Sequence, residues 1–293
     1  MAVGQAGSSG EAKARYMTPV NVFRTRQAEV PIHAFANERE EAFTAGRQTG
    51  FIPLDLGPHY GCNYLATTPL MLGRYAIIRA GEELACDLFA TGLAGYVLRG
   101  VGVAICPDRS FEWASGDALL LPAVGTIIRA REDAIIFCIT DEPLLSFLGA
   151  RPSASVPAIR YPAEDIERQL AAVYERGDDE DLTGRAVFLT HDGGGAYGTT
   201  MPALISTITT LEAGGVQRPH HHNAAAITLC LSEDELESVV DGVSCRWRHG
   251  LVQITPPCAV HAIYNRGKSR MTSFVSQDSG LFYHMRTTGF AFD

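Results

Sequence analysis

The chain has 293 residues, a formal net charge of -9 and 46% hydrophobic residues. This length is enough for two ordinary domains, each with its own buried core, so we expect two domains. The negative charge and the absence of any Lys/Arg run argue against nucleic-acid or membrane partners, which basic patches bind.

The cysteines are scattered without C-x-x-C spacing, so they form neither a disulfide framework nor a zinc motif. The sequence also shows no cleavable apolar leader and no apolar stretch long enough to cross a bilayer. We therefore expect a soluble, cytoplasmic protein whose cysteines are mostly buried free thiols, namely Cys62, Cys86, Cys106, Cys138, Cys230, Cys245 and Cys258.

The N-terminal part is expected to be a tail followed by an arm. Residues 1–15 are small, polar and glycine-rich, which is typical of a disordered tail. Residues 16–60 are expected to form an arm that packs on the domain that follows, with a helix over Asn37–Phe43. From Cys62 to Gly149, short β-branched and apolar runs alternate with glycines, a pattern that predicts an all-β sandwich or barrel.

A linker is predicted over residues 151–184. It begins with two prolines in Arg151–Pro157 and continues into an amphipathic helix from Pro162. Ile166 and Leu170 fall on one face of this helix, together with Val173 and Tyr174, and Gly177 is expected to end it.

The segment from about Ala186 repeats the first β region. A shift of about 133 residues aligns Ala80-Gly81 with Ala213-Gly214, and also aligns the prolines Pro122 and Pro256. Two copies of one β-barrel are therefore expected. This alignment places three histidines of the second copy, His220, His222 and His261, opposite Asp87, Phe89 and Ile127. The first copy is thus expected to lack a metal site.

His220 and His222 are two residues apart, so in an extended strand both face the same side while His221 faces outward. With His261 from a distant segment they predict a divalent-metal site. The alternative is a histidine-rich loop beside an unrelated buried histidine. Three neutral imidazoles leave coordination positions open, whereas a structural zinc site closes itself with four protein ligands.

The surrounding residues resemble the two motifs of the cupin superfamily. The second motif, G-x5-P-x-G-x2-H-x3-N, is matched by Gly250, Pro256, His261 and Asn265, with Cys258 in place of its inner glycine. The first motif is matched by Gly214-x5-His220-x-His222, but the carboxylate that normally follows is missing, because the chain reads Asn223-Ala-Ala-Ala-Ile227.

More narrowly, the chain resembles bicupin dioxygenases that cleave gentisate, salicylate or 1-hydroxy-2-naphthoate. The resemblance is carried by His222-Asn-Ala-Ala-Ala-Ile, Ser238-Val-Val-Asp-Gly242 and Ile254-Thr-Pro-Pro. It implies an all-β bicupin, with two tandem double-stranded β-helix (jelly-roll) barrels and a few short helices. The expected divisions are an N-terminal barrel with its arm over 16–150, without metal, and a C-terminal metal-binding barrel over 185–293.

The resemblance also implies Fe(II) on His220, His222 and His261, with O2 and an aromatic carboxylate as reactants and a homo-oligomer as the assembly. The family's iron is typically in the N-terminal barrel, whereas here the ligands lie in the C-terminal one. Alternatives are a lyase, isomerase or hydrolase that uses Mn, Ni or Zn, and a cupin that binds a metal or small molecule without catalysis.

Gln217, Arg246 and Asp278 are the candidate catalytic or substrate-contacting residues, with Arg248 beside them. An aromatic carboxylate needs a cationic or hydrogen-bonding partner, and a proton-relay group could lie beside it. Asn265 is expected to stabilise a turn rather than bind metal. Cys258 is expected to be a small buried residue in the place of a glycine.

Overall fold

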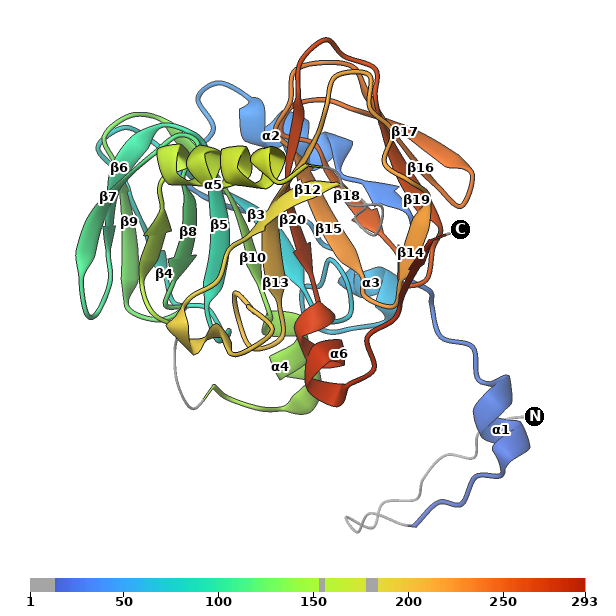
Figure 1. The fold of residues 1–293 in the computed structure, drawn as a ribbon. Helices are drawn as coiled ribbons and strands as arrows, with labels where there is room; N and C mark the ends of the chain where they lie inside the picture. Colours follow the sequence, from blue (N-terminus) through green and yellow to red (C-terminus); the bar gives the residue numbers. More distant parts are fainter. Residues whose placement is uncertain (1–13, 153–155, 178–183, 293) are drawn as a thin grey trace.

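The computed structural model describes residues 14–152, 156–177 and 184–292, and the predicted tail lies almost entirely outside them. Strands dominate, as the sequence predicts, and they form two barrels side by side (Figure 1). Within the described residues, no helix has both the length and the apolar character needed to cross a membrane.

The first half contains the arm and the N-terminal barrel. Its helices are α1 (Pro19–Arg24), α2 (Ala36–Phe43), α3 (Gly57–Tyr60) and α4 (Glu142–Leu148). Its strands are β1 (His33–Ala34), β2 (Gly50–Pro53), β3 (Leu72–Ile78), β4 (Glu83–Cys86), β5 (Leu93–Arg99), β6 (Val101–Ile105), β7 (Ser110–Ala114), β8 (Ala118–Leu121), β9 (Thr126–Ala130) and β10 (Ala134–Thr140).

The second half contains the linker and the C-terminal barrel. Its helices are α5 (Ala163–Glu175), the short 3-10 helix η1 (Asp192–Gly194) and α6 (Ser279–Met285). Its strands are β11 (Ile159–Tyr161), β12 (Arg185–Phe188), β13 (Ile205–Leu211), β14 (His220–His222), β15 (Ala226–Cys230), β16 (Leu236–Val240), β17 (Val243–Trp247), β18 (Val252–Thr255), β19 (His261–Asn265), β20 (Met271–Gln277) and β21 (Phe290–Phe292).

The sheet topology confirms the internal duplication. One sheet of the first barrel has the order β8-β5-β10-β3, and its counterpart in the second barrel has the order β18-β15-β20-β13. The other two sheets correspond in the same way, as β7-β6-β9-β4 and β17-β16-β19-β14. The two halves are therefore copies of one antiparallel barrel.

Strand alternation explains how the two barrels join. On β10, Ile135, Phe137 and Ile139 face the main core between the barrels, and Phe274 of β20 meets Phe137 there with ring centroids 6.2 Å apart. The intervening residues Ala134, Ile136 and Cys138 belong to a separate cluster inside the first barrel. The sheet of the first barrel is thus covered on both faces, which accounts for its long apolar runs such as β10.

The first barrel is filled and the second is hollow. When the paired strands of the two barrels are matched, large interior residues of the first correspond to smaller ones of the second: Leu93 corresponds to Ala226, and Leu121 corresponds to Thr255. Likewise Ile136 corresponds to Ser273, because each lies four residues before the end of β10 or β20. Small and polar side chains in the second copy leave the space that leucine and isoleucine fill in the first.

The structure corrects the prediction of which residues in the first copy are equivalent to the three histidines of the second. β4 pairs Cys86 with Thr126, as β14 pairs His220 with His261, and the inward tryptophans of β7 and β17 fall into the same register. The residues equivalent to His220, His222 and His261 are therefore Cys86, Leu88 and Thr126. The sequence alignment was one residue off at each position, and such a slip exchanges the two faces of a strand.

Both predicted helices are confirmed. α2 covers the expected segment, and α5 buries Ile166 and Leu170 with two acids, Glu164 and Asp165, in its first turn. The left-handed φ of +85° at Gly177 follows its C-terminal end, as glycine permits.

The arm reaches further than predicted, because it packs on the second barrel as well as the first. β1 pairs with β18 of the C-terminal barrel, while β2 pairs with β3 of the N-terminal one. Arg248 also lies 2.7 Å from Glu40 of α2 in an ion pair. Arg248 therefore joins the arm to the second barrel and does not line the cavity described below.

Candidate metal centre

The short strand β14 positions two of the three histidines. His220 and His222 are buried, whereas His221 between them is half-buried and faces away from the cavity, as strand alternation predicts. The neighbouring strand β19 begins at His261, which is the pairing partner of His220. Residues far apart in the sequence thereby bring three imidazoles to one end of the barrel.

Each imidazole is oriented by a backbone carbonyl two residues away. The Nδ1 atoms of His220, His222 and His261 lie 2.9, 2.8 and 2.9 Å from the carbonyl oxygens of Arg218, Ala224 and Ala259. A carbonyl only accepts, so each Nδ1 carries the proton and each Nε2 keeps its lone pair. Such hydrogen bonds fix the tautomer and ring orientation of metal-ligating histidines.

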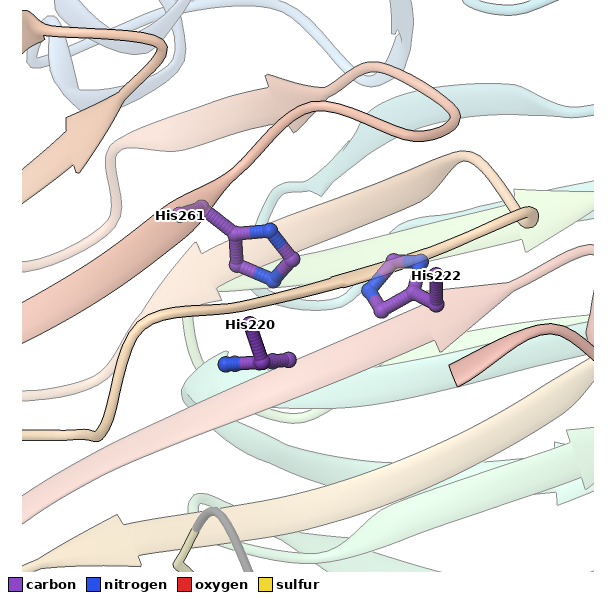
Figure 2. Close-up of side chains that lie close together, drawn as sticks. All are labelled: His220, His222 and His261. Atoms are coloured by element: carbon purple, nitrogen blue, oxygen red, sulfur yellow. The ribbon is translucent and has the colours of Figure 1, made fainter. Parts of the chain in front are cut away.

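The three rings face one another (Figure 2), and their ligand atoms all lie within 4.8 Å of one another. This is close to the roughly 4 Å that separates two nitrogens on opposite sides of one ion. Within the described ranges, no other group of three or more His, Cys, Asp or Glu side chains comes together in this way. The donor set fits a borderline divalent metal with open positions.

Burial keeps two of the imidazoles, His222 and His261, neutral. Desolvation lowers the pKa of His222 to about 4 and that of His261 to about 4, despite the hydrogen bonds that each makes to a backbone carbonyl. Neutral rings at pH 7 need lose no proton before they bind a cation.

The histidines form one end of a cavity of about 260 Å³ inside the second barrel. Phe282 and Tyr283 of α6 also line this cavity, and the Phe290 ring of β21 lies beside His220 with ring centroids 5.3 Å apart. β21 itself pairs with β14, so the C-terminal segment is joined to the strand that carries His220 and His222.

Gln277 is a site residue that the sequence reasoning missed. Its Nε2 lies 3.2 Å from Nε2 of His222, and Ser279 donates from its hydroxyl to the Gln277 Oε1 at 2.7 Å. Strand alternation could have indicated it, because Gln277 faces the same side of β20 as Ser273 and Val275, toward the cavity.

Gln217 lines the cavity, as a residue in contact with substrate must. Its side chain is buried, and its Oε1 has no hydrogen-bond partner. Its backbone N–H donates to the carbonyl of Ile263 at 2.8 Å, which fixes it beside β19.

Arg246 does not contact the cavity, contrary to prediction. It lies exposed on β17 opposite Glu237, whereas the next residue, Trp247, is buried and lines the cavity. Because neighbouring side chains on a strand face opposite ways, the inward position of Trp247 excludes Arg246.

Asp278 has a structural contact where a proton relay was predicted. It is buried at the end of β20, does not line the cavity, and its Oδ1 accepts the backbone N–H of Ala225 at 2.9 Å. In the first copy, Asp141 occupies the same place and accepts the N–H of Thr91 at 2.8 Å. Because the barrel without histidines keeps this contact, we assign it to barrel architecture rather than to catalysis.

Asp278→Asn is expected to gain stability relative to the wild type as the pH rises. Burial raises the pKa of Asp278 from 3.8 to about 7, so the contribution of this carboxyl to stability is complete below pH 3.8 and is lost as the pH rises through 7. Asparagine keeps an oxygen for Ala225 and cannot ionise. The difference in unfolding free energy should grow by about 2 to 4 kcal/mol from pH 4 to pH 8, as measured by urea unfolding. A difference that does not change with pH would contradict this account of the carboxyl.

Two further predictions concern the turns beside the histidines. Asn265 is confirmed as a turn-stabilising residue, since its Nδ2 donates to the carbonyls of Leu211, Glu212 and Ser269. Cys258 is exposed, so its predicted burial is wrong. Its φ of +62° explains why the cupin motif has glycine there, and its N–H donates to the carbonyl of His222 at 2.7 Å.

Solved structures share this architecture. Salicylate 1,2-dioxygenase from Pseudaminobacter salicylatoxidans superposes with a TM-score of 0.72 and 14% identity, over 94% of this chain and 92% of that one. The chain has the bicupin fold. A structure of that dioxygenase with gentisate matches this bicupin with a TM-score of 0.71 and 13% identity, over 94% and 89% of the two chains.

A smaller cupin also resembles this bicupin. The cupin 2 conserved barrel domain protein from Leptotrichia buccalis matches with a TM-score of 0.52 and 14% identity, over 86% of this chain and 97% of that one. At such identities the likeness concerns the fold.

In sequence, the bicupin is similar to 5-aminosalicylate 1,2-dioxygenase from Comamonas sp, with 27% identity over 99 residues. This match covers 33% of the chain and 24% of the relative, so it spans about a quarter of that relative's length. No protein-family model matches the sequence.

Proposed function

We propose that this bicupin is an Fe(II)-dependent dioxygenase that opens the ring of a hydroxylated aromatic acid. The observation that carries the proposal is the convergence of three imidazoles, each with its Nδ1 hydrogen-bonded to a carbonyl, at one end of a cavity. The names of the similar proteins, which include salicylate and 5-aminosalicylate 1,2-dioxygenases, support the reaction class.

His220, His222 and His261 would hold the ion through Nε2. Fe(II) bound there would supply a redox-active Lewis acid with open positions for a chelating substrate and dioxygen. Because all three ligands are neutral, they leave the charge of the ion uncompensated, which favours an anionic chelating group.

Other residues shape the cavity beyond the histidines. Gln217 offers a polar contact from beside β19, and Phe282, Tyr283 and Phe290 add aromatic surface to the lining. Burial of His220 and His222 strengthens the electrostatic attraction between an ion held there and an anionic ligand.

Oxygen uptake tests the proposal. The protein should be purified without oxygen, loaded with Fe(II), and given gentisate, salicylate or 1-hydroxy-2-naphthoate before oxygen is admitted. We expect consumption of one O2 per molecule of at least one of these acids, with loss of the aromatic absorbance. If none of the three acids causes uptake although Fe(II) is bound, the proposed reaction is wrong.

A further inference from the structure

The cavity extends inward from the histidines along β20. Its lining includes Gln277, Val275 and Ser273, which alternate along that strand. Ser273 is four residues from Gln277, or roughly 13 Å along an extended strand. We call the end of the cavity at Ser273 and Trp247 the inner end.

The inner end carries uncharged polar side chains among apolar ones. Gln253 accepts hydrogen bonds at its Oε1 from the Trp247 indole at 2.6 Å and from the Ser238 hydroxyl at 2.7 Å. Hydroxyls of Thr207, Thr209 and Thr228 also line the cavity, and none of its described lining residues is an Asp, Glu, Lys or Arg. A charged substituent entering this space would lose its hydration without meeting a counter-charge.

Among the described residues that line the cavity, two have a buried side-chain polar atom without a hydrogen-bond partner. Ser273 is fully buried and its Oγ makes no hydrogen bond, and the Oε1 of the buried Gln217 makes none either. Such atoms cost free energy unless something satisfies them. In the first copy the position of Ser273 is Ile136, so the barrel does not need a hydroxyl there for folding.

We propose that the substrate carries its only anionic group at the metal and a neutral hydrogen-bonding substituent on the far side of its ring, received by Ser273 and Gln217. This inference rests on the proposed function, because it places the chelating group at the histidines. A hydroxyl or amide substituent satisfies both wall atoms, since the serine hydroxyl can donate or accept and the glutamine oxygen accepts. A second carboxylate is excluded.

Binding without turnover tests this substrate class. Fe(II)-loaded protein is titrated calorimetrically in the absence of oxygen with salicylate, with gentisate, and with 5-carboxysalicylate, which has a carboxylate where gentisate has its second hydroxyl. We expect gentisate to bind at least about tenfold more tightly than 5-carboxysalicylate. Equal affinities for these two acids would overturn the proposal.

Variants then test the two wall atoms. Ser273→Ala and Gln217→Met should each weaken the binding of gentisate about fivefold to tenfold. The affinity for salicylate should not change, because salicylate lacks the substituent on the far side of the ring. Ser276→Ala is the matched control, since Ser276 lies on the same strand but bonds Ser206 instead of lining the cavity. The proposal is wrong if Ser273→Ala and Gln217→Met change the affinities for gentisate and salicylate by the same factor.

Oxygen uptake by the same samples separates this inference from the proposed reaction. Discrimination between the acids without oxygen uptake would contradict ring cleavage while supporting the substrate class. Uptake without discrimination would support ring cleavage and contradict the substrate class.

Discussion

His222→Ala is expected to abolish retention of Fe(II), with less than a tenth of an equivalent remaining after gel filtration, while the far-ultraviolet circular dichroism stays that of the wild type. Replacing groups that only support a ligand costs about 10–100-fold in metal affinity, so removal of a ligand should cost more. The fold should survive, because the interior of the second barrel is a cavity at this point and β14 is held by pairing on both sides.

His221→Ala is the matched control for this experiment. It removes an imidazole from the same strand, but from the face that does not line the cavity. Its iron content, measured by plasma emission spectrometry, should equal that of the wild type. Stoichiometric iron in His222→Ala would show that the ligand assignment is wrong, and loss of iron in both variants would point to disruption of β14.

The convergence of the three histidines could be predicted from the sequence because it depends on short-range rules. The period of two in a strand separates His221 from its neighbours, and the motif spacing from Gly250 to Asn265 selects His261. The duplication was also visible, since turn glycines and prolines recur at nearly constant spacing in both copies.

The rest of the site depends on the register of strand pairing and on which face of a strand points into the barrel, and neither can be read from the sequence alone. Arg246 and Trp247 are neighbours, and only the pairing of β17 with β16 decides which of them enters the barrel. Asp278 is a titratable group near the motif, but its partner is the backbone N–H of Ala225, which no side-chain pattern reveals. The contact of Gln277 with His222 joins residues that are 55 positions apart in the sequence, so no local pattern indicates it.

The hollow interior points to a variant that closes the cavity with residues the fold already uses. In the first barrel Leu93 pairs with Leu121, and the equivalent pair in the second barrel is Ala226 with Thr255. Both of the latter line the cavity. The double variant Ala226→Leu/Thr255→Leu places the leucine pair of the first barrel in the second.

We expect Ala226→Leu/Thr255→Leu to lower the affinity for gentisate more than about 100-fold, because the added side chains occupy the space of the ring and overpacking of a filled site costs about 1–3 kcal/mol for each insertion. Iron content is measured in parallel, because Ala226 pairs with Gln277, whose Nε2 lies 3.2 Å from Nε2 of His222. The melting temperature should be equal or higher, because leucine fills empty space. Ile227→Leu, on the same strand but facing the core between the barrels, is the control for strand perturbation. Gentisate binding that survives the double substitution, with iron bound and the fold intact, would show that the substrate does not occupy this cavity.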